Sequence, residues 1–101
     1  MVEVIWSKTA TEQLKRSVQF IQQERGLYYA ELVLSKILSA VNYLEEFPKI
    51  GTKEPLLKSR KIEYRFIIVW SYKIIYSKNK DKIIISRVFH TSQKPTKMFS
   101  K

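Results

Sequence analysis

Several residue types are scarce in this 101-residue chain, and each scarcity excludes a class of protein. There is no cysteine, so disulfides and thiolate metal sites are excluded. One histidine, His90, is too few for a histidine-based metal centre, and we expect neither a metal nor a cofactor. No secretion signal opens the chain, and no apolar run reaches the roughly 18–20 residues of a membrane span. These absences predict a cytoplasmic protein without membrane contact.

What remains is a composition typical of a small packed domain. The chain is 45% hydrophobic, it contains thirteen aromatic residues, and glycine occurs twice. Such a chain buries a core and is too short for two of them, so residues 1–101 are predicted to form one domain. Residues 89–101 are interpreted as a strand end followed by a basic tail.

Acidic residues are scarce in the second half of the chain. Residues 1–48 hold five basic and six acidic side chains, a net charge of −1, whereas residues 49–101 hold fourteen and three, a net charge of +11. A basic surface of this kind favours polyanions, because each phosphate contact releases counterions. Ribosome or nucleic-acid binding is the first interpretation. A solvated lysine-rich surface and an acidic protein partner are the alternatives.

The first half of the chain has helical periodicity after a short strand. Val2, Val4 and Trp6 alternate with other side chains, as in a half-buried strand. Thr9 and Glu12 have capping-box spacing, which predicts a helix from about residue 8, and Arg25-Gly26 is a typical helix end. A second helix is indicated by an apolar stripe that ends before Phe47-Pro48 and comprises Ala30, Leu34, Ile37, Val41 and Leu44.

The second half has the alternation of a β-sheet. Three strand-like runs follow one another, "IEYRFIIVW", "YKIIYS" and "IIISRVF", with short links at Ser71 and at residues 79–82. Short links between successive strands predict an antiparallel meander. The element order is β-α-α-β-β-β. The predicted fold class is therefore α+β, a small mostly antiparallel sheet with a two-helix hairpin packed on one face.

The chain resembles the RelE/ParE superfamily of toxins from bacterial type II toxin–antitoxin pairs. The resemblance lies in "VIWSKTATEQL", "LEEFPKIG", "YRFIIVWSYKIIYS" and "IIISRVFH", which occur in matching order over about residues 2–95. It implies a cognate antitoxin that neutralises the toxin, and operator DNA bound only through that antitoxin. RelE-like members cut mRNA in the ribosome without a metal, and ParE-like members poison DNA gyrase.

Four residues are the candidates for catalysis. Metal-free RNA cleavage needs an acid or base near neutral pH, which His90 can supply, and cations that stabilise charge on the phosphate. Arg87 and Arg65 can supply such cations, and Lys73 stands where RelE-like enzymes often have an arginine. The alternatives are a salt bridge for Arg65, a solvated lysine, and a histidine that merely closes a strand. Arg87 and His90 are three residues apart, so a regular strand would point them to opposite faces unless a bulge intervened.

A second group of basic residues is expected to form a rim that binds RNA or the ribosome. It comprises Lys53, Lys58, Arg60, Lys61 and Lys94. Charge and residue types together favour a ribosome-dependent mRNA endonuclease. The alternatives are a gyrase poison, which does not need His90, and a degenerate toxin that serves only as the antitoxin's partner at their operator.

Overall fold

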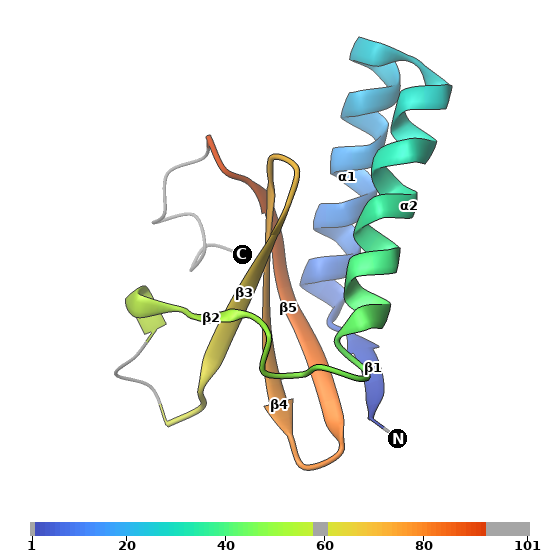
Figure 1. Ribbon diagram of the computed structural model, residues 1–101. Coiled ribbons are helices and arrows are strands. Elements are labelled where there is room, and N and C mark those ends of the chain that lie inside the picture. Colours follow the sequence, from blue (N-terminus) through green and yellow to red (C-terminus); the bar gives the residue numbers. More distant parts are fainter. Residues whose placement is uncertain (1, 58–60, 93–101) are drawn as a thin grey trace.

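A computed structural model of the chain describes residues 2–57 and 61–92 (Figure 1). Two helices and five strands, with one short 3-10 turn, follow the predicted order with one small strand added between the helices and the meander. The bounds are β1 Glu3–Trp6, α1 Lys8–Arg25, α2 Leu27–Tyr43, β2 Thr52–Lys53, the 3-10 turn Pro55–Leu57, β3 Tyr64–Val69, β4 Tyr72–Asn79 and β5 Lys82–His90. The predicted α+β class is confirmed. Neither helix in the described ranges is long and apolar enough to cross a membrane.

Helix α1 begins at Lys8, as predicted, but its cap lies two residues before the predicted Thr9. The cap is Ser7, whose side chain accepts a hydrogen bond from the backbone N–H of Ala10 at 3.0 Å. The prediction of a capping box from Thr9 to Glu12 is therefore wrong, because Thr9 already lies within the helix. The predicted end at Arg25-Gly26 is confirmed. Gly26 has φ +92°, a backbone conformation that L side chains rarely adopt, and it lets α2 start at once.

The helical hairpin covers one face of the sheet, called here the helix face (Figure 1). Four of the five predicted stripe residues of α2 are buried, but Val33 is buried where Leu34 was expected. The core between the layers also contains residues of β4 and β5, namely Ile74, Tyr76, Ile83, Ile85 and Val88. Burial of this apolar surface is what holds the hairpin on the sheet.

The sheet has the strand order β1-β5-β4-β3-β2. Strands β3, β4 and β5 form the predicted antiparallel meander, and β2 adds two residues at one edge. Strand β1 pairs in parallel with β5, from Glu3 opposite Lys82 to Trp6 opposite Ile85. The first and last of the described strands are therefore neighbours, which the alternation pattern alone could not indicate.

Strand β5 contains an irregularity that changes which face its residues occupy. Tyr76 lies opposite Ile85, but the residue before it in β4, Ile75, lies opposite Arg87. Ser86 is therefore an extra residue in β5. Ile83 and Ile85 lie in the helix-face core. A regular strand would place Arg87 on the same face as Ile83 and Ile85, but the bulge puts it on the opposite face.

The opposite face of the sheet, called here the outer face, has a small apolar cluster of its own. Its buried members are Leu57, Ile75 and Phe89, with Tyr64 and Phe66 packed against them. Leu57 comes from the 3-10 turn, so the segment after β2 folds back over the sheet (Figure 1). This segment encloses Lys73, one of the candidate site residues.

Candidate functional site

Lys73 lies on the outer face and is engaged in a buried ion pair. Its Nζ is 2.6 Å from Glu54 Oε2, and the two side chains are 17% and 1% exposed. The ammonium also lies 4.2 Å from the centre of the Phe66 ring, a cation–π contact. The alternative of a solvated lysine on a wet sheet face is therefore wrong. The positive charge of Lys73, which was expected to bind a phosphate, is already paired with the carboxylate of Glu54.

Arg87 and His90 point to opposite faces of the sheet. Arg87 lies opposite Ile75, an outer-face residue, whereas His90 lies opposite Tyr72, a helix-face residue. The bulge comes before Arg87, so the three intervening steps along β5 remain regular and separate the two side chains. The structure thus brings Lys73 and Arg87 to one face but places His90 on the other.

His90 is the last residue of β5, as predicted, and its ring has defined neighbours. It meets Tyr72 edge to face, with ring centres 5.3 Å apart. Its Nδ1 accepts the backbone N–H of Ser92 at 3.0 Å and lies 2.7 Å from that residue's hydroxyl. An accepting Nδ1 leaves the proton of the neutral ring on Nε2. These contacts close the end of the strand, which agrees with the alternative that His90 merely closes a strand.

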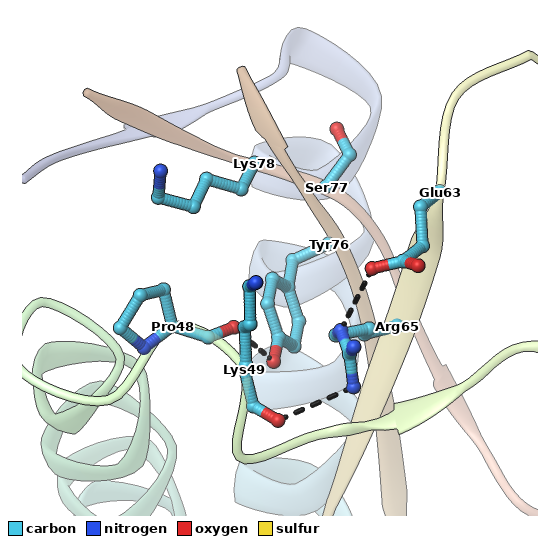
Figure 2. Close-up of a pocket in the computed structure, with 7 residues that line it drawn as sticks. All are labelled: Pro48, Lys49, Glu63, Arg65, Tyr76, Ser77 and Lys78. Atoms are coloured by element: carbon cyan, nitrogen blue, oxygen red, sulfur yellow. Dashed lines mark hydrogen bonds and ion pairs between the residues drawn. The ribbon is translucent and has the colours of Figure 1, made fainter. Parts of the chain in front are cut away.

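Arg65 holds a loop. Its guanidinium donates to the carbonyl oxygens of Gly51 at 2.7 Å and Lys49 at 3.2 Å, and it pairs with Glu63 (Figure 2). The salt bridge weighed as the alternative for Arg65 is present. Hydrogen bonding by Lys53 and the charge of Arg65 lower the pKa of Glu63 below its ordinary value of 4.5.

Tyr76 holds the same loop from inside the core. Its hydroxyl donates to the carbonyl of Pro48 at 2.8 Å and accepts the N–H of Gly51 at 3.0 Å. Figure 2 shows Tyr76 and Arg65 side by side next to the loop, with Ser77 and Lys78 lining the same small hollow. These two side chains fix the segment from residue 48 to residue 51 to the sheet through hydrogen bonds to its backbone.

The predicted basic rim is described in part. Lys53 lies on β2 and pairs with Glu63, with its own side chain 70% exposed, and Lys61 is exposed just before β3. Lys58, Arg60 and Lys94 lie outside the described residues, as does most of the basic tail. Within residues 2–57 and 61–92, no three histidine or acidic side chains gather closely enough to hold a metal ion. The role of the rim in RNA or ribosome binding stays a prediction.

We expect the stability of the fold to decrease at alkaline pH through Tyr76. Burial raises the pKa of its hydroxyl above the ordinary value of 10.0. The folded state then keeps a proton that the unfolded state releases, so the stabilisation is complete below pH 10 and is lost as pH rises through the folded-state pKa. Urea titrations between pH 8 and pH 11 measure this loss. Tyr76→Phe, which has no proton to lose, should show a smaller decrease, and an equal decrease in both proteins would contradict the assignment.

The model of the family described as the ParE toxin of the type II toxin–antitoxin system parDE matches residues 4–95. The chain belongs to this ParE toxin family. The expected membership of the RelE/ParE superfamily is thereby confirmed. As a toxin of such a pair, this ParE-family protein has a cognate antitoxin for a partner.

A solved structure supports the same fold. A chain of the chromosomal ParDE system from P. aeruginosa superposes with a TM-score of 0.75 over 91% of this chain and 98% of that one, at 18% identity. At that identity the likeness concerns the fold of the ParE-family toxin and not its chemistry. No curated protein sequence matches.

Three residues that matter to the candidate site carried little signal in the sequence. The partners of these residues, which are Glu54, Gly51 and Tyr76, are distant along the chain. Glu54 lies between two lysine-rich stretches, and nothing in the sequence indicates that its side chain is buried. The signal available was indirect. Gly51 is one of two glycines, and it lies three residues after Pro48, at the end of the "LEEFPKIG" segment that carries part of the family resemblance.

Proposed function

We propose that this toxin arrests growth by binding DNA gyrase through protein–protein contact, without cutting RNA, and that its antitoxin prevents that contact. The observation that carries the proposal is the ion pair between Lys73 and Glu54. A cation held at 2.6 Å by a buried carboxylate is poorly placed to stabilise charge on a phosphate. The separation of Arg87 from His90 supports the same conclusion, and gyrase is the usual target of ParE toxins.

The second candidate is the ribosome-dependent mRNA endonuclease. The net charge of +11 on residues 49–101 favours it, because such a surface attracts RNA. In that case His90 and Arg87 would act as acid or base and as phosphate ligand. Action on operator DNA, in either case, is proposed to require the antitoxin.

Replacing His90 separates the two candidates. We expect His90→Asn to inhibit gyrase supercoiling within about twofold of wild type, because Asn keeps an acceptor for the Ser92 N–H but cannot transfer protons near neutral pH. A nuclease that used His90 should lose about 10²–10⁴-fold in cleavage rate. The measurement is supercoiling by purified gyrase, in parallel with primer extension on mRNA from a translation reaction.

Arg87→Gln serves as the companion variant on the outer face. Cleavage of mRNA by wild type that either substitution abolishes would overturn the proposal in favour of the nuclease. If the wild-type chain neither inhibits gyrase, nor cuts mRNA, nor arrests growth, the chain is a degenerate toxin that acts only as an antitoxin partner.

A further inference from the structure

The small hollow of Figure 2 is lined mainly by basic side chains. Among the described residues that line it, Lys49, Arg65 and Lys78 contribute three positive charges, and Glu63 contributes one negative charge. The Glu63 carboxylate is already paired, with Lys53 at 3.3 Å and with Arg65 at 3.1 Å. Three bases and one acid give the lining a net charge of +2. Such a hollow attracts an anion.

These cations keep donor groups that no described residue uses. In the part of the chain that the structure describes, the Nζ of Lys49 makes no hydrogen bond or ion pair. Arg65 donates from Nε and Nη1, to Glu63 and to the loop carbonyls, and its Nη2 has no described partner. Lys78 donates one hydrogen bond, to the carbonyl of Lys80 at 2.6 Å, from an ammonium that carries three N–H groups. An oxyanion in the hollow can therefore accept charge-assisted hydrogen bonds from more than one of these side chains.

The size of the hollow restricts the ligand to a few atoms. Its volume is about 50 Å³. One water molecule needs roughly 10–15 Å³ of such space, so the hollow holds a group of about three or four atoms. That is the size of a carboxylate. Nucleobases and sugars are too large to enter.

Exposed apolar side chains flank the hollow along the chain. Phe47 precedes Pro48 and is 46% exposed, and Ile50 follows Lys49 and is 56% exposed. The Phe47 ring stacks on that of Tyr43, with ring centres 4.7 Å apart, so these two ring faces are closed to a nucleic-acid base. Apolar contacts beside a polar one are typical of protein interfaces, whereas contacts with nucleic acid are more polar.

Acidic side chains beside this surface oppose a polyanion. Glu45 and Glu46 lie in the turn directly before Phe47 and do not line the hollow. A nucleic-acid strand carries a phosphate on every nucleotide, so a strand with one phosphate in the hollow would bring others toward these carboxylates. A protein segment can place a single carboxylate in the hollow and apolar residues on Phe47 and Ile50. The charges therefore favour an acidic protein segment over RNA or DNA.

We propose that the hollow binds one carboxylate of an acidic protein segment, whose apolar residues pack against Phe47 and Ile50. The carboxylate accepts hydrogen bonds from Lys49 and Lys78, and Arg65 supplies a third positive charge. Charge complementarity is what selects this partner. The inference goes beyond the proposed function and does not depend on it, because a gyrase poison, a nuclease and a degenerate toxin would all present the same hollow.

The test uses a probe of this chemistry, a fluorescently labelled synthetic peptide of alternating glutamate and leucine. The intact toxin is added, and binding is followed by fluorescence anisotropy. We expect Lys49→Met with Lys78→Met to weaken binding about tenfold, because two cations of the hollow are lost. The melting temperature should stay within about 3 °C of wild type, since both side chains are exposed. Lys49→Met alone, which breaks no described contact, should weaken binding about threefold.

Lys15→Met with Lys36→Met is the matched control. Both lysines are exposed on the helices and do not line the hollow, and their loss lowers the net charge by the same amount. Binding of the peptide should change less than about twofold.

A second readout locates the ligand. The backbone N–H of Gly51 donates to the hydroxyl of Tyr76, which lines the hollow. The NMR signal of this amide should shift when the peptide or sodium acetate is added, and it should not shift with sodium chloride at the same ionic strength.

Equal weakening by the hollow pair and the control pair would overturn the inference, because binding would then depend on net charge alone. Failure of the wild-type toxin to bind the peptide would overturn it as well. An oligouridylate with the same number of negative charges is the competing anion. If it binds more tightly than the peptide and the hollow pair abolishes that binding, the hollow is a phosphate site and the protein assignment fails. Gyrase inhibition is measured separately, so failure of the gyrase proposal leaves each of these results unchanged.

Discussion

Removal of the Glu54 carboxylate is expected to destabilise the protein by about 3–5 kcal/mol, since it leaves the Lys73 ammonium largely buried without its partner. The stability of a domain of this size is about 5–15 kcal/mol, so Glu54→Ala should approach complete unfolding under mild denaturation. Chemical denaturation monitored by circular dichroism measures the change. Lys73→Met should have a similar effect, because it removes the cation from beside the buried Glu54 carboxylate.

Replacing both Glu54 and Lys73 should restore most of the stability that each single substitution removes. Glu54→Leu with Lys73→Met fills the same space with apolar atoms, and we expect a stability within about 1 kcal/mol of wild type, or above it. Lys53→Met is the matched control, because it breaks the exposed pair with Glu63 and should change stability by less than about 1 kcal/mol. A double variant as unstable as the single ones would contradict the ion-pair account.

The same double variant tests function. It contains no cation at position 73, so a toxin that uses Lys73 to hold a phosphate should be inactive even when folded. Under the proposed gyrase mechanism, it should still arrest growth. The two measurements on one protein therefore separate a structural lysine from a catalytic one.

Gly51→Ala is expected to be the most damaging single-methyl change, with a loss of about 3–5 kcal/mol. A Cβ at this position would lie 2.6 Å from the Tyr76 hydroxyl and 2.7 Å from the backbone carbonyl oxygen of Phe66. The backbone carbonyl cannot move without disturbing β3, so the loop must lift. It would then lose the hydrogen bonds that Tyr76 and Arg65 make to it. The melting temperature should fall by about 12 °C or more.

Gly26→Ala is the comparison for this prediction. No atom lies within 4 Å of a Cβ there, so its cost comes from φ +92° alone and should be about 1–3 kcal/mol. Adding Tyr76→Phe to Gly51→Ala removes the closest contact but leaves the carbonyl of Phe66, so the pair should remain destabilised. Full recovery of the wild-type stability on adding Tyr76→Phe would contradict the steric explanation.

The layer structure was predictable because local patterns specify it. Residues 64–69 alternate in the sequence, and the clusters show Ile67 and Val69 on one face of the sheet and Tyr64 and Phe66 on the other. The helix end at Gly26 and the strand end at His90 were also correct, since glycine and turn residues act within a few positions. The cap was misassigned because Ser7 and Thr9 are both good caps, and the choice depends on backbone geometry.

By itself, the sequence determined the class of fold, the order of the elements, the location of the charge and the resemblance to a toxin superfamily. These depend on spacing and composition. Tertiary structure alone decided which faces the candidate residues occupy and which partners they meet. The bulge at Ser86 set the face of Arg87, and the fold of residues 52–57 brought Glu54 to Lys73. Pairing register and the burial of a distant partner are non-local, and no local pattern encodes which carboxylate will meet a given lysine.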